Sequence, residues 1–224
     1  MPHPLLEYIF YINLDSRPDR NKQTIQELLQ IGTTQNFERF PAITHSIGAV
    51  GCTLSHIRCI EMAKERSYPY VFICEDDIQF LQPLVLQENL QKFWDTPPPD
   101  DWDVLILGGN NFQPYEVFSD YAIHVHFCAT TTGYIVAQHY YDTLLDNFKQ
   151  SAQLLEKHSE KHYLYAIDVF WRKLQKPKES RWYMLIPPTV TQRPNYSDIE
   201  KKEVDYGHWM LVIDKQNSDT FEES

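Results

Sequence analysis

The chain alternates between short apolar runs typical of buried strands and longer stretches with the spacing of amphipathic helices. The apolar runs are YIFYINL (8–14), VFIC (71–74), WDVLILGG (102–109), AIHVHF (122–127), GYIVA (133–137) and WYMLI (182–186). The helical patterns cover about 18–29, 48–65, 84–94, 139–156 and 166–174. This alternation predicts an α/β fold with a mostly parallel central sheet flanked by helices.

The length of 224 residues suits one α/β domain. No repeat or change of composition marks a second domain, so we predict one domain over residues 1–213. The polar residues 214–224 are expected to form a disordered C-terminal tail. The longest apolar run is shorter than the roughly 20 residues that a membrane-spanning helix needs, so we expect a protein that does not span a membrane.

Acidic residues exceed basic residues, 31 to 20, for a formal charge of −11. Affinity for nucleic acid depends on neutralising phosphates, so this balance argues against a nucleic-acid partner. The N-terminal residues lack the pattern of a secretory signal, and the four cysteines are not spaced as a disulfide framework. We therefore expect a cytoplasmic protein with reduced thiols.

Three consecutive carboxylates, Glu75, Asp76 and Asp77, follow the apolar run VFIC. Like charges about 4 Å apart repel by about 1 kcal/mol in water and about 4 kcal/mol at the effective dielectric of a protein surface. Ligands of open α/β sheets bind at the carboxyl ends of strands, and hard divalent cations prefer carboxylate oxygens. On an extended chain Glu75 and Asp77 would face one side, toward a metal, and Asp76 the other. The plain alternative is a solvated acidic turn.

Two loops near helix starts could hold an anionic ligand. The sequence NLDSRPDR brings Arg17 and Arg20 to a turn, where guanidinium groups suit phosphates and flat rings. The alternative is an ordinary helix start, with Asp19 favoured by the helix dipole and Arg20 in solvent. The sequence GAVGCTLSH (48–56) offers free backbone N–H groups at the start of the second helix.

Several other polar residues have both a chemical and a structural interpretation. Cys52, His56 and Cys59 share a helix face, but a buried face explains this spacing better than a zinc site. His124 and His126 are expected to satisfy neighbours or face water rather than bind metal. Asp168 lies among aromatic residues near a helix start, where burial would suit a general base; the alternative is an ordinary N-terminal helix acid.

Common catalytic motifs are absent from the sequence. It contains no GxSxG, HExxH, GxxxxGK[ST] or GxGxxG pattern. Their absence argues against the common hydrolase, metalloprotease, P-loop and dinucleotide-binding classes.

Seven motifs, taken in order, resemble those of glycosyltransferase family 25, which includes bacterial lipooligosaccharide galactosyltransferases and procollagen galactosyltransferases. They are FYINLDSRPDR (10–20), GAVGCTLSH (48–56), FICEDDI (72–78), WDVLILGG (102–109), TTGYIVAQHYYDTLL (131–145), AIDVFW (166–171) and TQRPNYSDIE (191–200). The resemblance implies a single nucleotide-sugar-binding domain of the GT-A type. It also implies inverting transfer of a hexose, galactose first and glucose next, from a UDP-sugar to a hydroxyl of a glycan or a hydroxylysine-like protein site.

The resemblance also assigns roles to individual residues. It implies a Mn²⁺ (or Mg²⁺) ion bound by Asp77 and Glu75, with His208 as a further ligand. Asp168 would be the base that accepts the acceptor proton, with Asp198 as the second choice. The implied donor-binding residues are Asn13, Leu14, Asp15, Arg17, Arg20, Ser55, His56 and Asp76.

Two other functions remain open at this point. Ala49 stands where the family commonly has an acid, which would fit a catalytically degenerate member that binds a glycan or a protein without turnover. The same carboxylates could also serve a metal-dependent phosphoryl-transfer enzyme.

Overall fold

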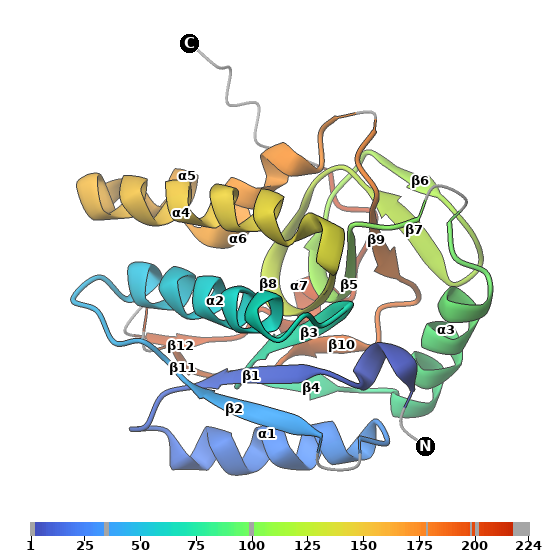
Figure 1. Cartoon of the computed structure of the whole chain (residues 1–224), viewed down its shortest axis with the longest axis horizontal. Helices are drawn as coiled ribbons and strands as arrows, with labels where there is room; N and C mark the ends of the chain where they lie inside the picture. The colour runs from blue at the N-terminus through green and yellow to red at the C-terminus, as the bar shows by residue number, and fades with distance from the viewer. Residues whose placement is uncertain are drawn as a thin grey trace.

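An eight-stranded sheet forms the centre of the structure, a computed structural model that describes residues 3–33, 36–98, 101–177, 179–197, 199 and 202–216 (Figure 1). The strand order is β2-β1-β3-β8-β5-β9-β7-β6. These strands are β1 (Ile9–Asn13), β2 (Phe37–Pro41), β3 (Tyr70–Glu75), β5 (Val104–Asn111), β6 (Tyr115–Val117), β7 (Ala122–Val125), β8 (Cys128–Ala137) and β9 (Trp182–Leu185).

The sheet contains both parallel and antiparallel strand pairs, yet most of its strands run in the same direction. The pairs β1–β2, β1–β3 and β5–β9 are parallel, and the other four pairs are antiparallel. Only β7 and β8 run against the rest, so six of the eight strands share one direction. The predicted α/β class, with a mostly parallel sheet flanked by helices, is confirmed.

Helices cover both faces of the sheet. In Figure 1, α2 and α4 lie together on one side, while α1 lies on the opposite side, below β1 and β2. The helices are α1 (Pro18–Gln30), α2 (Gly48–Glu65), α3 (Pro83–Asp95), α4 (Tyr141–Lys157), α5 (His162–Tyr165), α6 (Ile167–Phe170) and α7 (Gly207–Met210). Two small sheets, β4 (Ile78–Phe80) with β10 (Val190–Gln192) and β11 (Asn195–Ser197) with β12 (Lys202–Val204), complete the layers.

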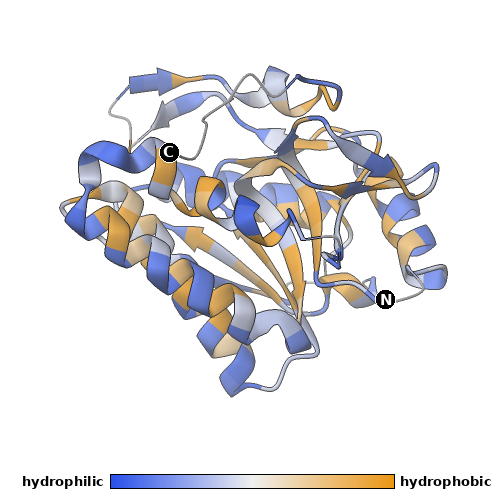
Figure 2. Ribbon diagram, turned by 90° about the horizontal axis from the view of Figure 1, so that it is seen from above, coloured by the Kyte–Doolittle hydropathy of each residue, from blue (hydrophilic) through white to orange (hydrophobic). Residues whose placement is uncertain are grey.

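Alternate residues of the central strands enter two separate hydrophobic cores. Phe10 and Ile12 pack in the core under α2 and α4, whereas Ile9 and Tyr11 pack in the core with α1 and α3. Burial on both faces explains why β1 and β3 have continuous apolar sequences rather than alternating ones. Figure 2 shows the result, with mainly hydrophobic central strands between helices whose outer residues are hydrophilic.

The elements that the sequence did not predict are short or late in the chain. The predicted helix over 166–174 is divided into α6 and a 3₁₀ turn (Trp171–Leu174). The three-residue strands β4, β6, β10, β11 and β12 were not anticipated. Lys215 pairs with Phe112, so packed chain continues past residue 213, while 217–224 lie outside the described residues.

Glu27 connects α1 to β4 and to Arg193, the residue that follows β10. This carboxylate is 5% exposed. It accepts hydrogen bonds from Arg193 Nη2 at 2.6 Å and from the Phe80 backbone N–H at 2.8 Å. One buried group therefore fixes α1 against both β4 and the residue that follows β10.

Replacing Glu27 with alanine should destabilise the fold by about 2–3 kcal/mol, because a buried N–H and a partly buried guanidinium would lose their partner. Chemical denaturation monitored by circular dichroism would measure the change. Glu65→Ala is the matched control, since Glu65 pairs with Arg58 at the surface, and it should leave the unfolding midpoint nearly unchanged. Equal losses in the two variants would contradict the structural role of Glu27.

A carboxylate cluster as the candidate active site

The acidic residues at the end of β3 divide between the two faces of the sheet. Glu75 lies on the side of α2, where its Oε1 is 3.4 Å from His56 Nε2. Asp76 lies on the side of α1, where its Oδ1 is 2.8 Å from Arg20 Nη1. Side-chain alternation along the strand therefore gives each acid its own partner from a different helix.

Asp76 is held by two side chains from the first strand–helix unit. Its Oδ2 accepts a hydrogen bond from Asn13 Nδ2 at 2.7 Å, while its Oδ1 accepts one from Arg20. Burial raises the pKa of Asp76, and Arg20 and Asn13 offset part of that rise. Arg20 is only 9% exposed, so its predicted alternative as a solvent-facing helix residue is wrong.

Asp77 lies at the turn without comparable support. Its Oδ1 is buried and accepts no hydrogen bond from the described part of the chain. The other oxygen, Oδ2, is 3.8 Å from Arg20 Nη1. Burial, followed by the nearby charges of Glu75 and Asp76, raises the pKa of Asp77 to about 8. A buried carboxylate of this kind needs a proton or a cation to offset its charge.

Glu75 is supported by polar groups from two elements. Thr131 Oγ1 donates a hydrogen bond to Glu75 Oε1 at 2.6 Å. Burial acts to raise the pKa of Glu75, but His56 and Thr131 bring it below its usual value. His56 is fully buried behind this carboxylate, with its Nδ1 3.0 Å from the hydroxyl of Tyr134. The predicted donor-binding residue His56 therefore reaches the cluster through Glu75.

Asp168 is joined to the cluster by two consecutive threonines. The backbone N–H of Thr130 donates to Asp168 Oδ2 at 3.1 Å, and the next residue, Thr131, binds Glu75. Thr130 has φ of 76°, an unusual conformation for a β-branched residue. Strained backbone of this kind concentrates at functional sites. Burial raises the pKa of Asp168, and the charge of Glu75 adds to the rise.

The loop after β1 forms one side of the cluster. Leu14 is half-buried there, and Asp15 is exposed. Arg39 Nη2 donates to Asp15 Oδ1 at 2.6 Å, and Arg39 Nε donates to Asn13 Oδ1 at 2.9 Å. Arg17 Nη2 reaches Asn195 Oδ1 at 3.3 Å, which connects this loop to β11.

Sequence reasoning missed two of the residues that shape this site. Thr131 was part of a recognised motif, but nothing local indicated that its hydroxyl would meet Glu75. Arg39 reaches the first loop because β2 pairs in parallel with β1, with Arg39 opposite Tyr11. A basic residue in the middle of the short strand-like run FERFP was the only available signal.

Three predicted site residues are not joined to the cluster by any described contact. Ser55 Oγ donates to the Gly51 carbonyl at 2.7 Å and accepts from the Ile43 N–H at 2.8 Å, which stabilises the start of α2. His208 is exposed on α7 and belongs to no described group of three close ligand atoms. Asp198 lies outside the described residues. The roles expected for these three residues, like those of the other predicted site residues, stay predictions.

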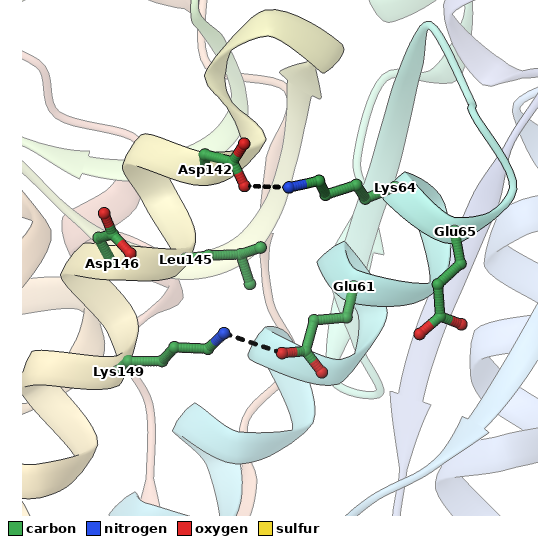
Figure 3. A pocket seen from close by; sticks show the side chains of 7 residues that line it. All are labelled: Glu61, Lys64, Glu65, Asp142, Leu145, Asp146 and Lys149. Atoms are coloured by element: carbon green, nitrogen blue, oxygen red, sulfur yellow. Dashed lines mark hydrogen bonds and ion pairs between the residues drawn. The ribbon is translucent and has the colours of Figure 1, made fainter.

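A surface groove between α2 and α4 is separate from this cluster (Figure 3). Its charged side chains pair with one another across the groove: Lys149 Nζ is 3.0 Å from Glu61 Oε1, and Lys64 pairs with Asp142. These ion pairs join the two helices and pair four of the charged side chains that line the groove. The Asp77 oxygen that accepts no hydrogen bond from the described residues makes the end of β3 the stronger candidate for chemistry.

Comparison with known proteins shows similarity to glycosyltransferase family 25, the family that the sequence motifs resemble. The family model described as "Glycosyltransferase family 25 (LPS biosynthesis protein)" matches residues 45–118, which contain α2 and the carboxylate cluster. Proteins named "Glycosyltransferase 25 family member" from Drosophila pseudoobscura pseudoobscura and Aedes aegypti are each 23% identical to this chain over 59% of its length. The matched part is 26% of each relative, so the chain corresponds to about a quarter of their length. The resemblance to family 25 is confirmed.

Solved structures give weaker similarity. A glycosyltransferase involved in glycosylation of the major capsid of PBCV-1 is 11% identical, with 79% of this chain and 80% of that chain covered, at a TM-score of 0.49. A mutant Drosophila galactosyltransferase in complex with manganese, UDP-Gal and xylobiose is 10% identical, with 62% of this chain and 52% of that chain covered, at a TM-score of 0.36.

Among the described residues, no helix is long and apolar enough to span a membrane.

Asp77→Asn should stabilise the metal-free protein, and more strongly at pH 8 than at pH 5. The pKa of Asp77 is about 8 in the folded chain, above its ordinary value of 3.8. Between those two values the folded chain keeps a proton that the unfolded chain has released, so stability falls as the pH rises. Asparagine does not ionise, so the variant should not lose this stability as the pH rises.

Thermal unfolding at both pH values would measure the effect. The exposed acid Asp142, which lies in the α2–α4 groove, gives Asp142→Asn as the control; that variant should show no such pH-dependent gain. If Asp77→Asn lowered the melting temperature equally at the two pH values, the assigned environment of Asp77 would be wrong.

Proposed function

We propose that this chain, a relative of the family 25 glycosyltransferases, transfers a hexose from a UDP-sugar to a hydroxyl acceptor with inversion at the anomeric carbon. Galactose is the first choice of hexose and glucose the second. The observation that carries the proposal is the buried Asp77 Oδ1, which accepts no hydrogen bond from the described residues and lies in the acidic turn that follows β3. The family match covers this segment.

The carboxylates have the chemistry that a hard divalent cation requires. Asp77 and Glu75 offer oxygen ligands, which suit Mn²⁺ or Mg²⁺ joined to substrate phosphates. A bound cation would offset the burial, and the repulsion by Glu75 and Asp76, that raise the pKa of Asp77. When bound, it would act as a Lewis acid that neutralises charge on the departing diphosphate.

The first loop would recognise the donor. Arg20 and Asn13 hold the carboxylate of Asp76 in one orientation, so this group can accept hydrogen bonds from a ribose or a donor sugar without first reorganising. Arg17 and Arg39 bring further positive charge to the same loop. Guanidinium groups at this edge would suit the diphosphate or the flat uracil ring.

Asp168 would accept the proton of the acceptor hydroxyl. Its raised pKa makes the ionised carboxylate a stronger base than an ordinary aspartate. The Thr130 N–H orients one oxygen, which leaves the other oxygen for the acceptor. The chain would therefore hold donor and acceptor on opposite sides of the Thr130–Thr131 segment, where positioning contributes to the rate.

The acceptor would be a glycan or a hydroxylysine-like site on a protein. A reducing compartment such as the cytoplasm would suit the four cysteines, all of which are free thiols. A catalytically degenerate chain that only binds glycans is the competing proposal, and it predicts binding that survives chelation.

The test is UDP release from UDP-galactose and UDP-glucose by the purified chain, with glycan acceptors, in the presence of Mn²⁺ or of a chelator. We expect Mn²⁺-dependent turnover that falls about 100-fold or more in Asp77→Asn, because the metal ligand is lost. Asp142→Asn, a matched aspartate outside the cluster, should keep the native rate. If UDP-sugars with Mn²⁺ neither bind nor raise the melting temperature, the donor assignment fails.

Asp168→Asn tests the base separately. The variant should lower kcat about 100-fold or more while the KM for the donor stays close to the native value, since removal of a general base affects proton transfer rather than donor binding. Full turnover in Asp168→Asn would place the base elsewhere. Glycan binding without turnover in the native chain would favour the binding-module alternative.

A further inference from the structure

A second group of potential metal ligands lies at the other end of the sheet, on the hairpin formed by β6 and β7. Glu116 of β6 lies directly opposite His124 of β7, and His126 follows two residues later. Residues two apart on an extended chain project from the same face. One carboxylate oxygen and one nitrogen from each ring lie within 4.8 Å of one another.

We propose that Glu116, His124 and His126 form a binding site for a Zn²⁺-type divalent cation. His126 Nε2 is 3.4 Å from Glu116 Oε1, and His124 Nδ1 is 3.9 Å from Glu116 Oε2. In a tetrahedral zinc site with bonds of roughly 2.1 Å, ligand atoms are about 3.4 Å apart. The two rings contact different oxygens of Glu116, and the three ligand atoms lie within 4.8 Å of one another, so small side-chain rotations would bring them to the spacing of a zinc site.

The tautomer of His124 is fixed by a backbone carbonyl. His124 Nε2 lies 2.6 Å from the Ser180 carbonyl oxygen. A carbonyl can only accept, so Nε2 must donate, and the neutral ring then presents the lone pair of Nδ1 toward Glu116. Metal-binding histidines commonly donate their second ring nitrogen to a carbonyl or carboxylate in this way. Burial, with the nearby His126, also lowers the pKa of His124 and favours the neutral ring.

The surroundings leave room for a further ligand. The side chains of His124 and His126 are 14% and 21% exposed, whereas that of Glu116 is 75% exposed. β6 is the last strand of the sheet, so the Glu116 side of the group is open to solvent. Water could fill the fourth position, as in open three-ligand zinc sites.

This site differs in chemistry and place from the carboxylate cluster. Two imidazoles and a carboxylate suit Zn²⁺, Co²⁺ or Ni²⁺, whereas an all-carboxylate set suits Mg²⁺ or Mn²⁺. β7 lies four strand positions from β3 in the sheet, about 19 Å at the usual strand spacing. One cation cannot serve both groups. The cation at the hairpin would join β6 to β7 and stabilise the edge of the sheet.

The structure refines the expectation that these histidines only satisfy neighbours. His124 does bond to the Ser180 carbonyl, but this contact uses one ring nitrogen and directs the other toward Glu116. Without a cation, the same geometry would be a set of polar contacts to a largely exposed glutamate, and such surface contacts contribute little to stability. A measurement of zinc binding therefore distinguishes a cation site from a set of contacts that holds no cation.

The test is Zn²⁺ titration of the tag-free, metal-stripped full chain by calorimetry, with Co²⁺ absorption as a second readout of tetrahedral nitrogen and oxygen ligands. We expect one equivalent of Zn²⁺ to bind and to raise the melting temperature. Glu116→Gln and His126→Gln should each weaken binding about tenfold or more, since even the loss of outer partners weakens zinc sites by that amount. Excess Mn²⁺ should not displace the Zn²⁺.

His158→Gln is the matched control. His158 Nδ1 is 3.9 Å from Glu160 Oε1, a pair that resembles His124 and Glu116 but lacks a second histidine. This variant should bind Zn²⁺ like the native chain. Cys52, His56 and Glu75 also offer one ligand atom each within 4.8 Å of one another. Zinc binding there, or any binding that is unchanged in Glu116→Gln and His126→Gln, would overturn the proposal. Absence of stoichiometric Zn²⁺ binding, or its ready displacement by Mn²⁺, would also overturn it.

Discussion

Repulsion among three adjacent carboxylates, one buried and two partly exposed, at the end of β3 is the constraint around which the rest of the molecule is arranged. The strand directs Glu75 toward α2 and Asp76 toward α1, and each helix supplies one partner, His56 or Arg20. Asp77, in the turn that follows, lies 3.8 Å from the same Arg20 and keeps a raised pKa, because burial and then the charges of Glu75 and Asp76 oppose its ionisation. Neither helix alone could compensate the cluster, so both layers of the fold are needed to hold it.

The central position of β3 brings distant segments to the same place. Its neighbour β1 ends in the loop that carries Asn13, and its other neighbour β8 begins close to Thr131. Both residues hydrogen-bond to acids of β3. Because β8 runs antiparallel to β3, its first residues, rather than its last, lie beside the carboxylates. A fully parallel sheet would have placed a different segment there.

The sequence predicted the elements whose burial depends on local pattern. β1, α1 and α2 were anticipated almost to the residue because both strand faces and one face of each helix are apolar. The separation of Glu75 from Asp76 also followed from strand geometry alone. The three-residue strands were not predictable in this way, because such short segments become strands only when a partner segment is in place.

The contacts that complete the site also depend on tertiary pairing. Thr131 is 56 residues from Glu75, and Arg39 is 26 residues from Asn13. No local pattern encodes either contact, since each depends on which strands become neighbours. The direction of His124 Nδ1 likewise depends on the Ser180 carbonyl, 56 residues away. Residue types were readable from the sequence, but their orientation was not.

The left-handed backbone of Thr130 has a further mechanical consequence. Its N–H binds Asp168, and the next side chain binds Glu75, so two adjacent residues span the gap between the two acids. The separation of these carboxylates is therefore set by the stiff covalent geometry of one dipeptide rather than by soft contacts between side chains. Thr130 and Thr131 act as a spacer, and the surrounding structure must hold Thr130 in its costly conformation for that spacer to keep its length.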